Sequence, residues 1–561
     1  MKKQKLSKFQ IWLRDGTPWI WFNAGAVTIS VLMLFGLLVI LGVNGLSHFW
    51  PRDVMRAVYT LPTADGIEEP VEIIGEIISS EETESARLQG SGLLLNADQE
   101  ILQRQLIRFG NRDLGSADFG WIFPQYLSEQ SWPEDITVLE RREWSDFYGR
   151  LQSLQENGQT LAVADPFEEL QRRLQRTEAI HAEINAIEDG EIARINWSME
   201  QLRLGERRLQ LEGNNSAEII STIRAERQTL LLEFEAVQSQ LNALYRDLER
   251  DTAQFEAANG VAVTIFLADI VRAYRPNAMG VVAKLGVYFE KLAEFLTTEP
   301  REANTEGGIF PAIFGTVVMV LLMSVFVTPF GVVAAIYLRE YAHQGFLTRL
   351  IRIAVNNLAG VPSIVYGVFG LGFFIYFVGG EIDQAFYPEA LPAPTFGTPG
   401  LLWASLTLAL LTVPVVIVAT EEGLARIPRS LREGSLALGA TKFETIVQVI
   451  FPMASPAMMT GLILAVARAA GEVAPLMLVG VVKLAPALPV NGIYPYVHLD
   501  QKFMHLGYHI YDVGFQSPNI EAARPLVFAT ALLLVIVIAT LNFAAAALRN
   551  RLREKYKTLD V

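Results

Sequence analysis

The chain has 561 residues, of which 51% are hydrophobic and only 19% are charged, whereas a soluble globular protein usually carries about 25% charged residues. It contains no cysteine, which excludes disulfides, thiolate metal sites and cysteine nucleophiles. The net charge of −14 divides unevenly, with 45 acidic and 25 basic side chains in residues 44–308 and 15 acidic and 21 basic ones elsewhere. This excess of acidic side chains argues against nucleic acid as a partner, because binding to a phosphate backbone requires clustered lysine and arginine side chains.

The first apolar run is Ala24–Val43, which contains no charged residue. About 20 such residues form a helix long enough to cross the hydrocarbon core of a membrane. The run is longer than the apolar core of a signal peptide, and no A-x-A cleavage site follows it, so we expect a retained anchor. With its basic start, this anchor forms a first unit of residues 1–43.

Residues 44–308 follow the anchor and are expected to divide in two. In residues 44–160, short apolar runs alternate with turn residues, and Val71–Ile78 (VEIIGEII) is typical of a strand, which predicts a mixed α/β module. In residues 166–256, apolar side chains recur every three or four positions, which predicts a long antiparallel helical hairpin. Its coiled-coil seam comprises Ile223, Leu230, Phe234, Val237, Leu241, Leu244 and Leu248.

The run Gly213-Asn214-Asn215 has the chemistry of the hairpin's turn, and Gly190 marks a kink. The seam either packs the hairpin on itself or docks onto the equivalent hairpin of a partner. Because an acidic surface repels anions, we expect residues 44–308 to act in assembly or regulation and not in the capture of an anionic substrate.

Five further apolar runs of spanning length follow, which predicts an α-helical integral membrane protein with six transmembrane helices; these runs are Ile309–Leu338, Ala354–Gly380, Pro399–Thr420, Ser455–Val482 and Pro525–Leu548. Lysine and arginine favour cytoplasmic flanks, and residues 381–397 have none. Both termini, including the basic tail 549–561, are therefore predicted to be cytoplasmic, and residues 44–308 periplasmic, at the inner membrane. The flanking basic residues are Lys2, Lys3, Lys5, Lys8, Arg14, Arg339, Arg349, Arg352, Arg426, Arg429, Arg432, Lys442, Arg549, Arg551, Arg553, Lys555 and Lys557.

A helix–turn–helix segment is predicted in residues 421–456, between spans four and five. Arg429–Leu438 favours a short helix, Gly439 can reverse the chain because glycine tolerates positive φ, and Lys442–Ile450 resumes a helix. The segment resembles the EAA loop of ABC importer permeases, EAA-x3-G-x9-I-x-L-P, although both alanines are replaced. The matching residues are Glu433, Gly434, Ser435, Gly439 and Pro452. The alternative is an ordinary amphipathic loop at the membrane surface.

Two charged residues, Arg468 and Glu472, interrupt the fifth span. A charge at the bilayer centre costs about 2.5–3.5 kcal/mol even on lenient scales, so such residues face the protein interior or a water-filled path. Their i, i+4 spacing places both on one helix face, where they can pair. The pair is either a structural lock or part of an anion path.

The same stretch carries a family resemblance. ARAAGEVAPL is similar to the AR-x-x-GE-x-x-P signature of the A-type permeases of Pst inorganic-phosphate ABC transporters, and the start of span two, from Gly307 to Thr316, is similar to their GGI-x-x-AI-x-GT. The resemblance covers about 307–548, and residues 44–308 resemble the N-terminal extension of long A-type permeases. It implies a type I ABC importer permease core that carries inorganic phosphate.

The resemblance also implies partners: an ATPase subunit dimer that receives Glu433, Gly434, Ser435, Gly439 and Pro452, a second, C-type permease as heterodimer, and an extracytoplasmic phosphate-binding protein. Arg468 would then attract the anion and Glu472 would hold Arg468 until release. No G-x-x-x-x-G-K-[ST] phosphate loop occurs, so ATP hydrolysis is expected in a partner chain and this chain is expected to be no enzyme.

No cofactor and no metal are expected. His505 and His509 lie four residues apart, but no third ligand accompanies them. Two other functions stay open: a permease for another oxyanion, sulfate or molybdate, which would share the 421–456 segment, and a membrane-anchored sensor or scaffold built around the hairpin. Five spans after the hairpin speak against the scaffold.

Overall fold

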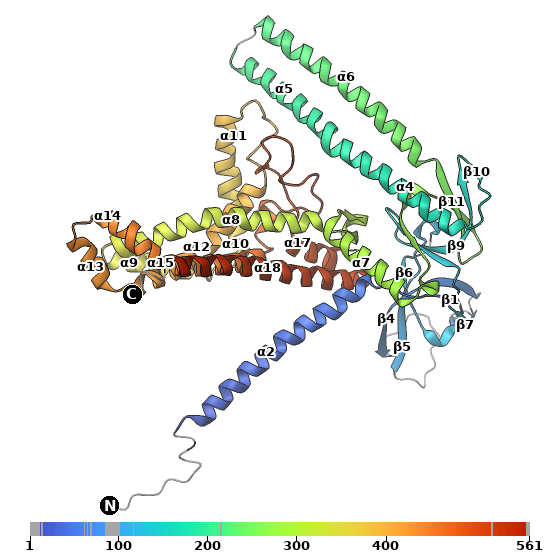
Figure 1. The fold of residues 1–561 in the computed structure, drawn as a ribbon, viewed down its shortest axis with the longest axis horizontal. Coiled ribbons are helices and arrows are strands. Elements are labelled where there is room, and N and C mark those ends of the chain that lie inside the picture. Colours follow the sequence, from blue (N-terminus) through green and yellow to red (C-terminus); the bar gives the residue numbers. More distant parts are fainter. Residues whose placement is uncertain are drawn as a thin grey trace, which may run out of the picture.

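The computed structural model describes residues 12, 15–60, 62–63, 66–67, 70–84, 101–115, 117–213, 216–517 and 520–556. It shows a helical bundle and a strand-rich insert, residues 44–308, from which a long helical hairpin projects (Figure 1). We call the bundle end next to the insert the insert end, and the opposite end, which carries residues 421–456, the loop end. Several residues used above lie outside the described residues: Lys2, Lys3, Lys5, Lys8, Arg14, Asn214, Asn215 and Lys557.

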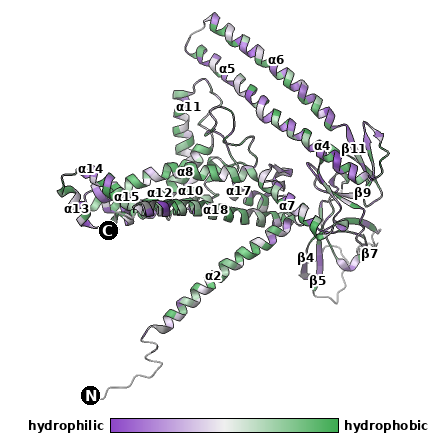
Figure 2. Ribbon diagram, in the orientation of Figure 1, coloured by the Kyte–Doolittle hydropathy of each residue, from purple (hydrophilic) through white to green (hydrophobic). Residues whose placement is uncertain are grey.

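Among the described residues, six helices are long and apolar enough to cross a membrane, which confirms the predicted number. Figure 2 shows their hydrophobic colouring. Each presents apolar side chains around much of its circumference, as expected where lipid replaces water. They are α2 (Thr17–Leu46), α8 (Phe310–Ile336), the run of α10 (Ser363–Phe369), η9 (Gly370–Gly379) and α11 (Gly380–Phe386), α12 (Leu401–Arg426), α15 (Phe451–Ala470) with the turns before it, and α18 (Ile520–Tyr556).

Two predicted span boundaries are wrong. The third span was predicted from Ala354, but residues 346–358 form a separate amphipathic helix, α9 (Phe346–Leu358), and the span begins after Pro362, because the residue before a proline is disfavoured in a helix. The fifth span was predicted to reach Val482, but α15 ends at Ala470 and a short helix, α16 (Leu476–Val479), follows a break at Gly471.

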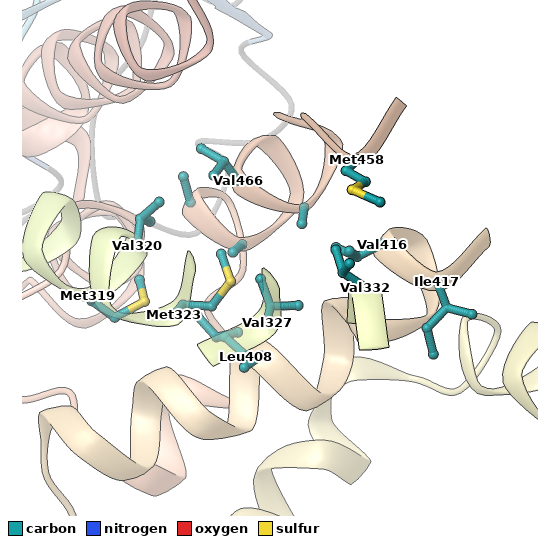
Figure 3. Close-up of a cluster of buried hydrophobic side chains, with 14 of the residues drawn as sticks. Met319, Val320, Met323, Val327, Val332, Leu408, Val416, Ile417, Met458 and Val466 are labelled. Atoms are coloured by element: carbon teal, nitrogen blue, oxygen red, sulfur yellow. The ribbon is translucent and has the colours of Figure 1, made fainter. Parts of the chain in front are cut away.

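The bundle core is built mainly from three helices, α8, α12 and α15, and both α8 and α15 pack extensively against α12. Methionine and aliphatic side chains of the three helices interdigitate there (Figure 3). Glycines bring the backbones close: a Cβ on Gly423 would lie 2.2 Å from Ala457 Cβ, and one on Gly461 would lie 2.9 Å from Ala419 Cβ. These close contacts fix α15 antiparallel to α12.

The described part of the insert contains two larger antiparallel sheets and two short strand pairs. The orders of the larger sheets are β6-β5-β4-β1-β7 and β12-β11-β9-β8-β13, with β10 paired to β9. The first sheet comprises β1 (Val54–Tyr59), β4 (Val71–Glu84), β5 (Ile101–Arg108), β6 (Phe119–Ile122) and β7 (Leu127–Ser131). The second comprises β8 (Ile136–Arg141), β9 (Phe147–Glu156), β10 (Gln159–Thr160), β11 (Asp251–Glu256), β12 (Ala262–Phe266) and β13 (Ile270–Tyr274).

Shorter elements connect these sheets to the bundle. Helix α7 (Val281–Thr297) runs from the second sheet to the insert end and meets α8. The predicted strand Val71–Ile78 is confirmed as the first part of β4. Other short elements are the strand pairs β2 (Pro62–Thr63) with β3 (Gly66–Ile67) and β14 (Pro300–Arg301) with β15 (Glu306–Gly307), and the helices α17 (Leu506–Tyr511) and η11 (Asp512–Gln516) before α18.

The hairpin consists of α4 (Pro166–Ile187), a π-helical turn η4 (Glu188–Ile192) at the expected kink, α5 (Ala193–Leu211) and α6 (Ala217–Leu248). Its seam packs on itself, with Leu230, Phe234, Val237, Leu241, Leu244 and Leu248 facing Ile184, Ile187 and Ile195.

The predicted end of the hairpin at Glu256 is wrong. Residues 251–256 form β11, whose alternate side chains are buried, and Phe255 packs in the core beneath the second sheet. This period of two is the pattern of a half-buried strand. Residues 251–274 thus return to the sheet that residues 136–160 begin, so the strand-rich part of the insert is not contiguous in sequence.

The hairpin also touches the bundle. Arg208 of α5 forms an ion pair with Glu389, in the loop between α11 and α12, and Glu389 is only 3% exposed. Trp197 of α5 makes an edge-to-face contact with Tyr494, in the loop between α16 and α17, at 5.9 Å between ring centroids. One rigid helix therefore contacts two separate connecting loops of the bundle.

Candidate functional site

The segment between α12 and α15 folds as a helix, a reversal and a second helix. Helix α13 (Arg429–Ala437) ends in a turn in which Ala440 N–H donates to Ser435 O and Gly439 N–H donates to Leu436 O, the two hydrogen bonds of a Schellman cap. Gly439 has φ of +90°, which glycine adopts without a steric penalty. The predicted helix, reversal and resumed helix are confirmed.

Helix α14 (Lys442–Thr445) begins with a capping box. Thr441 N–H donates to the Glu444 carboxylate at 2.7 Å, and Glu444 N–H donates to Thr441 Oγ1 at 3.3 Å. The Ser435 and Thr445 hydroxyls lie 2.9 Å apart and join the two helices. The π-helical turn η10 (Ile446–Ile450) then leads into α15, with Pro452 in its first turn. The reversal is thus rigidly closed by local hydrogen bonds.

Arg432 anchors this segment to the loop end of the bundle. Its guanidinium donates to the carbonyls of Leu424, at 2.7 Å, and Ile427, at 3.2 Å, at the end of α12, and it forms an ion pair with Glu340 at 2.9 Å. The carbonyls that end a helix lack partners within it, and a cation there is favourable. From the sequence, Arg432 served only to predict the orientation of the chain in the membrane. Its position one residue before Glu433 was the signal that it could also anchor this segment.

The tip of the segment presents apolar side chains to solvent. Leu438 is 91% exposed and Phe443 is 67% exposed, and Glu433 and Gly434 lie exposed on α13 beside them. Exposed apolar side chains gathered on a rigid, charged element are typical of an interaction site. Of the sequence-predicted residues here, Glu433, Gly434, Ser435 and Gly439 therefore lie together at the tip, whereas Pro452 lies at the start of α15.

Arg468 lies inside the bundle. Gly461 lies against Val416 and Ala419 of α12, and Arg468 follows seven residues later, about 10 Å farther toward the insert end. Val416 comes fifteen residues, or about 22 Å, after the start of α12 at Leu401. Arg468 is therefore about 12 Å below the insert end of α12, well within the depth of a membrane span.

Arg468 and Glu472 face each other loosely. Their closest atoms, Nε and Oε1, are 3.6 Å apart, and their side chains are 31% and 21% exposed. Glu472 does not lie on the span helix as predicted, because α15 ends at Ala470 and Gly471 forms a turn. A guanidinium with this exposure keeps donors that a small anion can reach. The pair is thus accessible within the bundle and not sealed in its core.

The break after α15 is packed tightly against neighbouring helices. A Cβ on Gly367 of α10 would lie 2.7 Å from Pro475 Cα, and one on Gly370 would lie 2.9 Å from Val479 Cγ1. This packing holds the chain reversal next to Glu472 in place. His505 and His509 are both buried near the insert end, and no group of three metal-ligating side chains occurs among the described residues.

Comparison with known proteins identifies the bundle. The family described as "Binding-protein-dependent transport system inner membrane component" matches residues 327–554. "Phosphate transport system permease protein PstA 1" of Mycobacterium tuberculosis (strain CDC 1551 / Oshkosh) is 34% identical over 297 residues, which are 52% of this chain and 88% of that protein. "Phosphate transport system permease protein PstA" of Mycobacterium leprae is 33% identical over 298 residues, again 52% of this chain and 88% of that protein.

Among solved structures, an inward-facing crystal form of the MetNI methionine ABC transporter is similar with a TM-score of 0.31 and 21% identity, over 43% of this chain and 93% of that chain. The assignment rests on the sequence relatives, which this chain covers over most of their length. The chain is a multi-pass inner-membrane permease, and it belongs to the PstA family of phosphate transport system permease proteins.

Proposed function

We propose that the chain is the permease subunit of an ABC importer that moves inorganic phosphate across the inner membrane. The observation that carries this proposal is the half-exposed guanidinium of Arg468 at membrane depth, in a chain whose relatives are phosphate permeases. A cation inside a span is costly and is kept where it serves a path for ions or substrate. Phosphate is an anion that an arginine fork binds with good geometry.

In this proposal, Arg468 attracts phosphate as it enters the bundle, and Glu472 holds Arg468 between transport cycles. The 3.6 Å separation supports this, because the pair is close enough for attraction but makes no hydrogen bond within 3.5 Å. An incoming anion can then replace Glu472 as the partner of Arg468 without breaking a tight bidentate bond.

The tip of residues 421–456 is the proposed contact with the ATPase dimer. Glu433, Gly434, Ser435 and Gly439 shape the rigid reversal, Pro452 starts the following span, and the exposed Leu438 supplies an apolar side chain for a cleft in the ATPase. Because Arg432 ties α13 to the end of α12 and to Glu340, in the turn that follows α8, a displacement of the tip moves the spans. ATP hydrolysis belongs to the partner.

The other proposed partners are a C-type permease, which completes a heterodimer, and an extracytoplasmic phosphate-binding protein. Both termini are proposed to be cytoplasmic and residues 44–308 periplasmic. The loop end then faces the ATPase, and the insert end faces the binding protein. The basic side chains at the loop end, among them Arg339, Arg349 and Arg352, support this orientation.

Uptake of labelled phosphate by cells whose only A-type permease is this chain tests the proposed function. We expect saturable uptake that requires the ATPase subunit and that a tenfold excess of sulfate or molybdate does not inhibit. Uptake of sulfate or molybdate in place of phosphate would assign another oxyanion, and an ATPase that fails to co-purify with the chain would favour the sensor or scaffold.

The insert is proposed to act in assembly or regulation, because α5 contacts two connecting loops through the Arg208–Glu389 and Trp197–Tyr494 contacts. Replacing residues 196–236 by a short glycine–serine bridge removes both contacts and joins Ile195 to Val237, which share the hairpin core. We expect normal insertion, residual uptake and a reduced yield of the complex, measured by labelled-phosphate uptake and co-purification.

The matched control inserts the same bridge after Gly213, in the hairpin turn, and keeps both contacts. It is expected to behave as the unmodified chain. Complete loss of uptake in a truncated chain that still forms the intact complex would show that the hairpin takes part in transport itself.

A further inference from the structure

A cavity of about 410 Å³ lies where the insert meets the bundle, and its lining includes residues of β4, β5, α7, the segment that follows α2 and the start of α18. This volume lies within the range of about 300–1,000 Å³ that small-molecule sites occupy. Aromatic and aliphatic side chains form part of its wall, namely Phe49, Trp50, Ile78, Phe119 and Leu526. The remainder of the wall is charged.

Most of the charged groups in this wall already have partners. Arg108 pairs with Asp146, at 2.5 Å, and with Glu306. Lys291 pairs with Glu140 at 2.6 Å. Buried charges are normally found in such pairs, because a lone charge is expensive to remove from water. Any charged group of the cavity wall without a partner is therefore informative.

Glu76 is such a group. It lies in the middle of β4, is only 8% exposed and lines the cavity. Within the described part of the chain its carboxylate makes no hydrogen bond and no ion pair within 4.0 Å. Burial raises the pKa of Glu76, against the attraction of Lys291, Arg108 and Arg52. The cavity thus contains one carboxylate that can still accept hydrogen bonds.

Arg52 is its counterpart of opposite charge. Its Nη1 donates to the carbonyl of Ile77 at 2.7 Å and to that of Ile78, the two residues that follow Glu76 on β4. No carboxylate lies within 4.0 Å of Arg52 among the residues that the structure describes. The two carbonyl bonds hold the guanidinium beside Glu76 but apart from it, so an acid and a base border the cavity without neutralising each other.

We propose that this cavity binds a small zwitterion of the phosphoethanolamine type, with its primary ammonium group on Glu76 and its phosphate group on Arg52. Ammonium supplies N–H donors to the carboxylate, and phosphate accepts from the free donors of the guanidinium. The aromatic wall formed by Phe49 and Trp50 suits the carbon atoms between the two charges and favours the adjacent cation. The same chemistry occurs in free phosphoethanolamine and in the headgroup of phosphatidylethanolamine.

The first test measures the affinity of the purified full chain for phosphoethanolamine by titration calorimetry. Glu76→Gln is nearly isosteric and should weaken binding about tenfold or more, because the neutral amide gives up the charge-assisted hydrogen bond to the ammonium group. Glu82→Gln, which changes an exposed carboxylate of the same strand, is the control and should leave binding unchanged. Phosphocholine, which has no N–H, should bind the unmodified chain as weakly as phosphoethanolamine binds Glu76→Gln.

The role of Arg52 is tested with ethanolamine. Arg52→Gln should weaken binding of phosphoethanolamine but not that of ethanolamine, which lacks the phosphate. Without ligand, we expect Glu76→Gln to unfold at the same temperature as the unmodified chain or at a higher one, because the substitution removes an unpaired buried charge. The proposal is overturned if the unmodified chain binds none of the probes, or if Glu76→Gln binds phosphoethanolamine as well as the unmodified chain does.

The second test identifies the source of the ligand. The chain is placed in nanodiscs of phosphatidylglycerol with either phosphatidylethanolamine or phosphatidylcholine, and free phosphoethanolamine is titrated. If the lipid is the occupant, phosphatidylethanolamine nanodiscs should abolish binding of the free probe, and the lipid should stay bound in native mass spectrometry, but not to Glu76→Gln. If the free zwitterion is the occupant, both nanodiscs should give the same affinity.

Discussion

Replacing Glu433 by lysine is expected to reduce phosphate uptake to background while the chain still folds and inserts. Glu433 is exposed on α13 and forms no ion pair among the described residues, so the change should alter the free energy of unfolding by no more than about 0.5 kcal/mol. A reversed charge at the tip of the proposed ATPase contact places like charges together, which costs several kcal/mol of binding. Uptake and co-purification of the ATPase are the measurements.

Two controls separate this effect from general damage. Gly434→Ala restores the alanine that the EAA pattern has at this position, and the added Cβ meets no atom of the chain within 4 Å. It should strengthen α13 by about 1 kcal/mol without loss of uptake. Glu554→Lys makes the same charge change on an exposed residue of α18 outside the segment, and it should transport normally. Normal uptake by Glu433→Lys at unmodified membrane levels would overturn the assignment of this contact.

The spans and the 421–456 segment follow from local sequence, because both depend on short-range rules. An apolar run of sufficient length has one stable state in a membrane, and Gly439 with the Thr441–Glu444 capping box specifies a reversal within a few residues. The predicted limits of two spans are wrong because apolar length alone does not show where a glycine or a proline ends a helix. Gly471 ends α15 within an apolar run that was predicted to be one helix. Pro362 divides another apolar run, so that its first part forms α9 and the span begins only after the proline.

The parts that the sequence did not reveal depend on contacts between distant residues. The short stretch Asp251–Glu256 forms a strand because it pairs with β9, which lies about a hundred residues earlier in the sequence. The anchoring of Arg432 requires Glu340 from another span. Glu76 lies in the sequence VEIIGEII, where a carboxylate within an apolar strand is a signal that the sequence does contain. Only the fold shows that Arg52 donates to the adjacent carbonyls.

The Arg468–Glu472 pair has two explanations that differ in what its removal does. If the pair is a structural lock, replacing both side chains by apolar ones should preserve the fold and also transport, because such replacements of buried pairs are often neutral in stability. If Arg468 also guides phosphate, the same double change should preserve the fold and abolish transport. The partial exposure of both side chains, 31% and 21%, favours a path that an anion can reach.

We therefore expect Arg468→Leu combined with Glu472→Leu to reach the membrane at normal levels, to assemble with its partners and to lose phosphate uptake. Glu472→Leu alone leaves the cation unpaired at membrane depth and should be the less stable variant, by roughly 1–3 kcal/mol after allowance for the exposure of Arg468. Arg468→Lys keeps the charge but not the planar fork, and it should retain part of the uptake. Thermal midpoints in detergent measure stability, and labelled-phosphate uptake measures transport. Near-normal uptake by the double variant would show that the pair has a purely structural role.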